Sequence, residues 1–255
     1  MRIKSIILAV VIMLQVMCVS SFAEDSSVQP VDYTTYIDQF GVATIPEYIN
    51  GVLTTSIPAK AFYANTQLKK VVLPQSVQKI DNYAFYKCAN LSEVVLSDNI
   101  TSIGINAFAH CIALCEVKMP LKLETVSEFS FMNCSGLKTV TFAENIKTIG
   151  FASFSNCANL STITLGAQLE NIAASAFAGC ALLEQITLPE KLIRVNEDTF
   201  SNCANLKSII VQSELTTISP RAYRNSPLAK ITLQPPVINA EVISQNTLTV
   251  TETIE

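Results

Sequence analysis

Along this chain, the spacing of the hydrophobic residues alternates between a helical period and the two-residue period of a strand. Apolar side chains in residues 80–91 recur with the spacing of one stripe on a short helix or helical turn. Val94 and Leu96 then alternate with Glu93 and Val95, which is the two-residue period of a strand. Proline or another breaker often follows, so the strand ends after a few residues. Each unit is therefore predicted to form a short strand, a turn and a short helical return.

This pattern repeats with a constant period of 23 residues. One aromatic row keeps the period without a slip: Phe62, Phe85, Phe108, Phe131, Phe154, Phe177, Phe200 and Tyr223. A small residue precedes every aromatic, and rows of leucine and of isoleucine or valine run in phase with it. A single unit cannot bury its apolar side alone, whereas stacked units align their strands into a parallel sheet over a shared core. The repeat therefore predicts an α/β solenoid.

The units also resemble a known repeat family. Residues 84–108 closely follow the pattern AFxxCxxLxxVxLPxxVxxIxxxAF, which resembles the leucine-rich repeats of the BspA-like bacterial surface proteins. The resemblance covers about residues 41–234, and residues 45–51 look like the family's first repeat, with a tight turn at Asn50 and Gly51. It implies a leucine-rich repeat solenoid with short parallel strands and short helical returns, and a role in adhesion at a cell surface.

The end units depart from this pattern. Asn65 and Ser226 replace the repeated cysteine, and Ile231 and Leu233 come one position early in the last unit. Degenerate end units are typical of caps. The predicted organisation is a signal peptide at residues 1–23, an N-terminal cap with a degenerate first repeat at 24–61, a solenoid of 23-residue units at 62–234, and a C-terminal cap or tail at 235–255.

The N-terminus has the features of an export signal. Arg2 and Lys4 form a short basic start, residues 6–19 are apolar, and residues 21–23 offer small side chains for cleavage before Glu24. An uncleaved membrane anchor is the weaker alternative, because the apolar run is shorter than the ~20 residues that a spanning helix needs. We therefore expect a secreted or cell-surface protein without a transmembrane segment after cleavage.

Cysteines form a row of their own with the same period: Cys88, Cys111, Cys134, Cys157, Cys180 and Cys203. They lie on the apolar stripe, which predicts structural free thiols in the core. Disulfides are the alternative in an exported protein, but in-register side chains about 5 Å apart exceed the ~3.8 Å that bridged Cβ atoms prefer. Cys115 falls on a solvent-facing row instead, and is a candidate for an intermolecular disulfide.

Several kinds of chemistry are not supported by the sequence. A net charge of −4 does not suit a nucleic-acid partner. A row with one cysteine in each coil does not converge on a metal ion. The single histidine, His110, falls on a polar surface row, and its neighbour Cys111 points in a different direction, so the two do not form a base and nucleophile pair. We therefore expect no catalytic site, no metal and no cofactor.

The remaining candidate for function is the outward side of the strands. The candidate protein-binding face consists of Lys70, Glu93, Glu116, Lys118, Thr139, Thr141, Thr162, Thr164, Gln185 and Thr187. The family resemblance implies adhesion to extracellular proteins or matrix components through this face. A glycan or nutrient recognition module and a structural envelope spacer without a specific ligand are the alternatives. Tyr83, Tyr86, Phe129 and Phe151 on the return side form a weaker candidate face.

Overall fold

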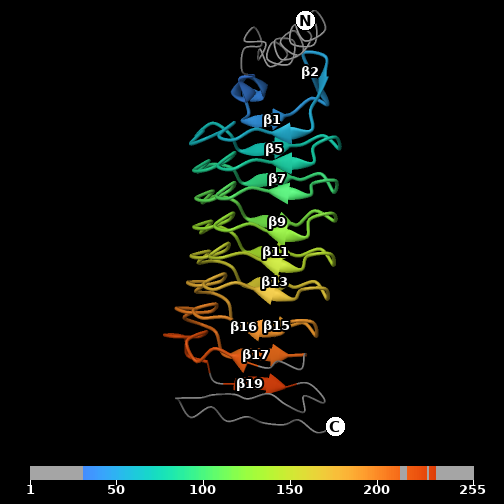
Figure 1. The fold of residues 1–255 in the computed structure, drawn as a ribbon. Helices are drawn as coiled ribbons and strands as arrows, with labels where there is room; N and C mark the ends of the chain where they lie inside the picture. The colour runs from blue at the N-terminus through green and yellow to red at the C-terminus, as the bar shows by residue number, and fades with distance from the viewer. Residues whose placement is uncertain (1–30, 213–216, 229, 234–255) are drawn as a thin grey trace, which may run out of the picture. The chain divides into compact units, whose positions relative to one another are not determined.

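The computed structural model describes residues 31–212, 217–228 and 230–233. From Tyr33 onward the described chain winds into a solenoid whose coils stack one on another (Figure 1). The predicted signal peptide at residues 1–23 and the predicted tail at residues 235–255 lie outside the described residues.

One strand from each coil builds the face that we call the strand face. Its strands are β1 (Val42–Thr44), β5 (Lys70–Val72), β7 (Glu93–Val95), β9 (Glu116–Lys118), β11 (Thr139–Thr141), β13 (Thr162–Thr164), β15 (Gln185–Leu188), β17 (Ser208–Val211) and β19 (Lys230–Leu233). Every ladder among them is parallel. Residues one period apart are partners in the regular units, as in the pairing of Val71 with Val94, whereas β1 pairs with β5 across a longer connection, as in the pairing of Ala43 with Val71. The shortened last unit pairs Ile209 with Ile231, so the chain restores the register despite the missing residue.

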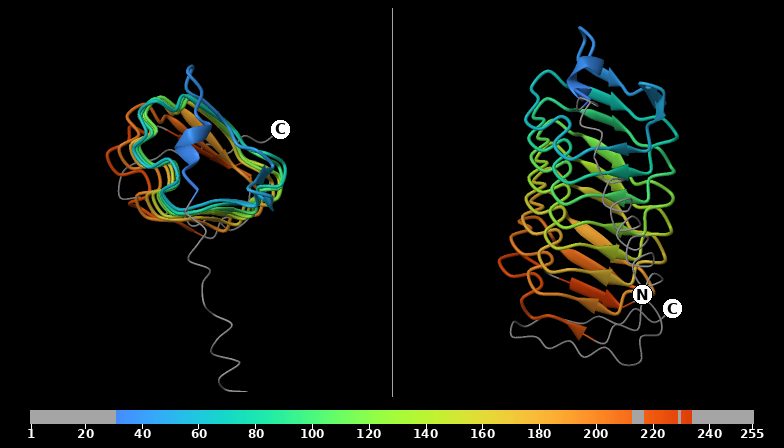
Figure 2. Two further views of the ribbon diagram at one scale, coloured as in Figure 1. Left: turned by 90° about the horizontal axis from the view of Figure 1, so that it is seen from above. Right: turned by 45° about the horizontal axis from the view of Figure 1, so that its top comes forward.

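A second row of two-residue strands follows the first row around each coil. Its strands are β4 (Ser56–Ile57), β6 (Lys79–Ile80), β8 (Ser102–Ile103), β10 (Thr125–Val126), β12 (Thr148–Ile149), β14 (Asn171–Ile172), β16 (Arg194–Val195) and β18 (Thr217–Ile218). These strands also pair in parallel. Viewed along the stack, the coils superpose and enclose one continuous interior (Figure 2).

The N-terminal end of the solenoid has its own elements. A 3-10 helix, η1 (Tyr33–Tyr36), precedes β1, and an antiparallel hairpin joins β2 (Tyr48–Ile49) to β3 (Val52–Leu53). Asn50 and Gly51 form the tight turn of this hairpin, both with positive φ. The turn predicted at these two residues is confirmed, because a two-residue hairpin loop of this kind needs left-handed backbone.

The returns are not helical, which corrects the sequence-based expectation of short helical returns. Each return is a run of turns, and every return before the last contains two left-handed residues four positions apart, such as Asn106 and His110 at φ 56° and 63°. A residue with positive φ cannot continue a right-handed helix. The amide of Phe108 donates to the oxygen of Ser130 in the next coil, 2.8 Å away, rather than to a carbonyl four residues earlier. The spacing that resembles a helical stripe therefore comes from turns held by the neighbouring coil.

The core is organised around the aromatic row. Phe62, Phe85, Phe108, Phe131, Phe154, Phe177 and Phe200 are fully buried. Consecutive rings are stacked nearly parallel, with the centroids of Phe85 and Phe108 4.9 Å apart and an interplanar angle of 3°. Burying a phenylalanine contributes about 1.5–3 kcal/mol, so this row is a principal stabilising element. The small residue before each aromatic allows this close approach of successive coils.

The strand face is interrupted at two places. Among the described strands, the ladders divide into the sets β1-β5-β7, β9-β11-β13 and β15-β17-β19, without a ladder from β7 to β9 or from β13 to β15. Val94 and Ile163, which point inward from β7 and β13, are half-buried, whereas Val117 and Val140 are buried. The returns remain hydrogen-bonded across the first interruption. At this place the described part of the second row also lacks a ladder from β8 to β10, although the amide of Cys115 still donates to the oxygen of Ser92 at 3.4 Å. The strand pairing is therefore incomplete there, while the returns stay hydrogen-bonded.

Candidate functional site

The repeated cysteines are placed in the interior of the solenoid, where all six are buried free thiols. Each Sγ atom lies within hydrogen-bonding distance of the backbone oxygen of the aromatic residue in the preceding coil. The Sγ to oxygen distances are 2.9 Å for Cys88 to Phe62, 3.2 Å for Cys111 to Phe85, 3.1 Å for Cys134 to Phe108, 3.2 Å for Cys157 to Phe131, 3.5 Å for Cys180 to Phe154 and 3.2 Å for Cys203 to Phe177. The thiols thus act as donors within the stack.

Burial also makes these thiols poor nucleophiles. Desolvation raises the pKa of Cys88 and of Cys134 to about 12. The pKa of Cys157 is raised well above its usual value, first by burial and then by the neighbouring Cys134 and Cys180. Because the thiolate is the reactive form of cysteine, this row is chemically inert at neutral pH.

Cys115 differs from the repeated cysteines because it is exposed. Its Sγ atom lies 3.2 Å from the oxygen of Ala113. Cys115 also lines a surface hollow of about 400 Å³ where the ladder between β7 and β9 is interrupted. The other residues of this hollow are Ser92, Glu93, Val94, Glu116 and Lys118. The hollow was not evident from the sequence, because the 23-residue period continues through it without change.

The candidate binding residues lie on the strand face, in register within each of its three sets of paired strands. Glu93, Glu116, Lys118, Thr162, Thr164 and Gln185 are exposed, whereas Lys70, Thr139, Thr141 and Thr187 are half-buried. The charged members gather on β5, β7 and β9, where Lys70 Nζ lies 2.7 Å from Glu93 Oε1. The threonines follow on β11 and β13, where Thr139 is paired with Thr162 and Thr141 with Thr164.

The strand face thus has two chemically different parts. Its charged part can form hydrogen bonds and ion pairs with a partner, while its threonine part offers hydroxyl and methyl groups in a regular array. Neither part contains an aromatic side chain among the ten candidate residues. Extended backbone with exposed polar side chains suits a broad contact with another macromolecule better than enclosure of a small ligand.

His110 is half-buried on the return side, where the sequence placed it on a polar surface row. Its ring meets the edge of Tyr86 at a centroid distance of 5.3 Å, and its Nε2 atom lies 3.3 Å from Asn133 Nδ2. Burial, and then the charge of Lys87, lower the pKa of His110. His110 therefore belongs to a small aromatic and polar cluster on the outside of the returns.

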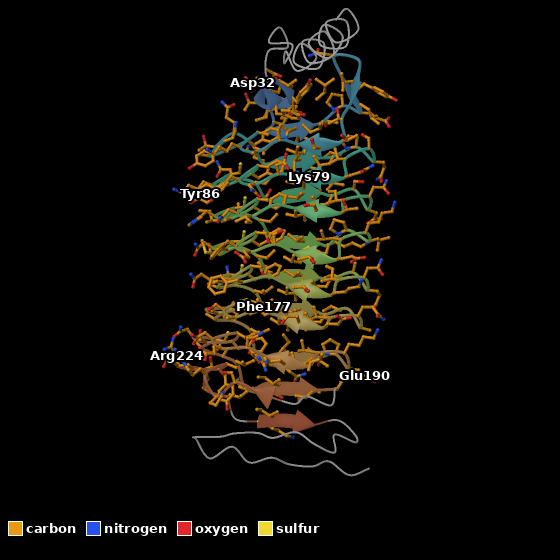
Figure 3. All side chains as sticks on the ribbon, viewed as in Figure 1. Asp32, Lys79, Tyr86, Phe177, Glu190 and Arg224 are labelled. Carbon is orange, nitrogen blue, oxygen red and sulfur yellow. The ribbon has the colours of Figure 1, made fainter. Side chains whose placement is uncertain are left out.

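The return side gathers tyrosines from consecutive coils. The rings of Tyr63 and Tyr86 are stacked with centroids 5.2 Å apart, and Tyr83 meets Tyr86 edge-on at 5.5 Å. Tyr86 lies at the return-side edge of the molecule in Figure 3. Phe129 and Phe151 form a separate edge-on pair at 5.3 Å. Four of these five rings were predicted from the sequence as a return-side face, whereas Tyr63 was not, although it lies one period before Tyr86.

In the described part of the chain, no group of three or more histidine, cysteine, aspartate or glutamate side chains is placed to hold a metal ion. Across the same residues, no helix has the length and apolar character required to cross a membrane.

These features define the class of protein: a leucine-rich repeat solenoid with short parallel strands and a continuous, closely packed core. A model of the BspA type leucine-rich repeat region matches residues 55–182 and 130–249. The chain belongs to this family. No curated protein matches the chain.

Several solved structures are similar to this chain, and those with a TM-score of 0.50 or more show that the fold is shared. A leucine-rich repeat protein from Eubacterium ventriosum is 24% identical, with a TM-score of 0.60 over 80% of this chain and 46% of that one. A leucine-rich repeat protein from T. pallidum is 23% identical, with a TM-score of 0.50 over 76% of this chain and 72% of that one. A leucine-rich cell surface protein from Faecalibacterium prausnitzii is 25% identical, with a TM-score of 0.49 over 79% of this chain and 62% of that one. The chain thus spans less than two thirds of the Faecalibacterium and Eubacterium proteins.

Proposed function

We propose that this chain is an exported, non-enzymatic binding protein, secreted or held at a cell surface, that adheres to extracellular proteins through its strand face. The observation that carries the proposal is the set of exposed polar side chains on β9 and β13, which are in register through β11, together with the exposed Glu93 on β7. The basic start and apolar run of residues 1–23, together with the family membership, support export to a surface. The inert, buried cysteine row favours a scaffold over a catalyst.

A protein partner fits the strand face because the face is long and chemically mixed. Glu93, Glu116 and Lys118 lie on adjacent coils, so a partner can meet opposite charges within a short distance. Charged groups of this kind mainly set the specificity and rate of association. The neighbouring threonines supply flat, weakly polar contact area beside them.

The proposal is tested with the purified chain from Glu24 onward and a panel of extracellular-matrix proteins. In the test variant Lys70, Glu93, Glu116 and Lys118 are changed to alanine. A matched control changes Lys122, Glu124, Glu144 and Lys147 to alanine, which removes the same number of each charge from exposed positions outside the strand face.

Saturable binding that the test variant loses and the control keeps would support adhesion through the strand face. Equal loss in both variants would point to nonspecific charge attraction and would contradict the proposed face. If a folded protein binds no matrix protein saturably, the spacer alternative replaces adhesion.

We also propose that Cys115 forms an intermolecular disulfide under oxidising conditions. Its thiol is exposed, whereas the six repeated cysteines are buried, so it is the accessible sulfur among the described cysteines. A covalent dimer on non-reducing electrophoresis, absent from Cys115→Ser, would support this. A dimer that persists in Cys115→Ser would contradict it.

A further inference from the structure

The tyrosine patch, defined as Tyr63, Tyr83 and Tyr86, is a second surface whose chemistry differs from that of the strand face. Tyr63 has 47% of its surface exposed and is the most open ring of the patch. Tyr86 is half-buried and contacts both other tyrosines, so it holds the patch together. Tyr83 and Tyr86 come from one return and Tyr63 from the return before it, and the rings contact one another across these two coils.

Unpaired positive charge borders this patch. Lys87 Nζ lies 5.4 Å from the centroid of the Tyr86 ring, which is a cation–π contact. The backbone amide of Lys60 donates to the oxygen of Asn82 at 3.3 Å, so the backbone of Lys60 lies beside the return that carries Tyr83, and its side chain is exposed. Within the described residues, neither lysine forms an ion pair with a carboxylate.

Negative charge is scarce in the same region. Asp81 is the single acidic residue in the return segments 58–66 and 81–90. Its Oδ1 atom lies 2.8 Å from Lys79 Nζ, so its charge is compensated locally. The tyrosine patch therefore combines exposed aromatic surface with a net positive border, although the whole chain carries a net charge of −4.

We propose that the tyrosine patch binds an anionic carbohydrate, in which C–H groups of a sugar ring lie against Tyr63 while a carboxylate or sulfate group contacts Lys60 and Lys87. The face of an aromatic ring is electron-rich and attracts the weakly positive C–H groups of a sugar, and it also offers apolar contact area. The lysines favour an acidic sugar over a neutral one. This site lies on the returns, so the proposal does not rest on protein binding by the strand face.

The size of the charged border argues against a nucleic-acid strand. Single-stranded nucleic acid is held by a positive groove that follows many phosphates, together with stacked bases. Here two unpaired lysines border three rings, which matches one or two acidic sugar residues rather than a long backbone. A single-stranded oligonucleotide is therefore a suitable negative control.

The test uses the purified chain from Glu24 onward with four probes: a sialylated trisaccharide, a hyaluronan tetrasaccharide, neutral lactose and a single-stranded oligonucleotide. The variants Tyr63→Ala and Lys87→Gln alter the patch. The matched controls are Phe151→Ala, which removes another exposed return-side aromatic, and Lys147→Gln, which removes an exposed lysine far along the solenoid. Thermal unfolding confirms that each variant is folded.

We expect saturable binding of at least one acidic probe, weakened by added salt because exposed charges are screened. Tyr63→Ala and Lys87→Gln should each weaken binding by about tenfold, whereas the two controls should change it by less than about twofold. Equal binding of lactose, preferred binding of the oligonucleotide, or no binding of either acidic probe would overturn the proposal. Unchanged affinity in folded Tyr63→Ala would also overturn it, because the tyrosines would then serve only to stack the coils.

Discussion

The Sγ atom of Cys111 lies 3.2 Å from the backbone oxygen of Phe85 in the preceding coil. The same contact recurs along the cysteine row, and at the C-terminal end the hydroxyl of Ser226 replaces the thiol, 2.7 Å from the oxygen of Phe200. From Cys88 to Ser226, a small side chain with a hydrogen-bond donor is thus the shared feature of this position, whereas Asn65 in the first unit accepts from the amides of Gln67 and Leu68. The cysteine row is explained by packing and donor geometry rather than by redox or metal chemistry.

Removal of one buried thiol should destabilise the solenoid. Cys134→Ala deletes the donor to Phe108 and leaves a small void in a fully buried site. The free energy of unfolding should fall by about 1–2 kcal/mol, as measured by urea denaturation. Cys115→Ala is the matched control at an exposed position and should change it by less than about 0.5 kcal/mol. Similar effects of the two substitutions would contradict a structural role for the row.

The buried thiols should also make stability depend on alkaline pH. Burial raises the pKa of Cys134 from its ordinary value of 9.0 to about 12. Between these values the unfolded chain releases this proton while the folded protein keeps it, so the free energy of unfolding must fall as pH rises.

Comparison of the wild type with Cys134→Ala isolates this contribution from other groups that titrate in the same range. Between pH 9 and about 12, the variant should lose stability less steeply, by about 1.4 kcal/mol per pH unit. Parallel stability curves from urea denaturation at several pH values would show that the thiol is not buried as described.

Because the returns contain residues with left-handed backbone, glycine and valine substitutions at these residues should rank in the opposite order from that in a helix. Asn156 has φ 59°, and its amide donates to the oxygen of Ala178 at 2.7 Å. Asn156→Val places a β-branched side chain in left-handed backbone and should cost about 1–2 kcal/mol, whereas Asn156→Gly should be nearly neutral. In a helix, glycine would instead be the more damaging of the two. Chemical denaturation of both variants therefore distinguishes the two conformations.

Hydrogen exchange should reveal the interruption between β7 and β9. The amide of Leu73 donates to the oxygen of Val95 at 3.2 Å, and the amide of Met119 donates to Thr141 at 2.9 Å. Leu96 holds the equivalent position at the interruption, where no ladder joins the described strands β7 and β9. Its amide should exchange at least about tenfold faster than those of Leu73 and Met119, as measured by nuclear magnetic resonance. Equal protection would mean that the strand face is continuous.

The sequence predicted the repeat, the strands and the inward rows because these follow directly from the 23-residue period. It was wrong about the returns, since spacings of four between apolar residues arise in left-handed turns as well as in helices. The sequence offered a cue to these turns: asparagine recurs at positions such as Asn133, Asn156 and Asn202, and asparagine tolerates left-handed backbone better than most residues.

The candidate sites were predicted unevenly. The register of Lys70 with Glu93 could be read from the period, and so could the alignment of the threonine pairs. The hollow beside Cys115 could not, because it lies at a local interruption of the strand pairing, where the sequence keeps the period. The tyrosine patch could have been found in full, since Tyr63 and Tyr86 occupy the same position in consecutive units.

The charged part of the strand face contributes little to stability, so it can be altered to test function. Lys70, which is half-buried, and the exposed Glu93 form a surface ion pair, and such pairs contribute at most about 1 kcal/mol. Replacement of Lys70 and Glu93 by alanine should therefore leave the midpoint of urea unfolding nearly unchanged. A large fall in the midpoint would mean that this pair supports the fold, and any loss of binding could not then be assigned to the face.

The most direct test of the account is the affinity of the purified protein for extracellular-matrix proteins, measured beside the fourfold variant of Lys70, Glu93, Glu116 and Lys118. The account predicts saturable binding to at least one matrix protein, with at least a tenfold loss of affinity in the folded variant. Unchanged affinity in that variant would contradict adhesion through the strand face.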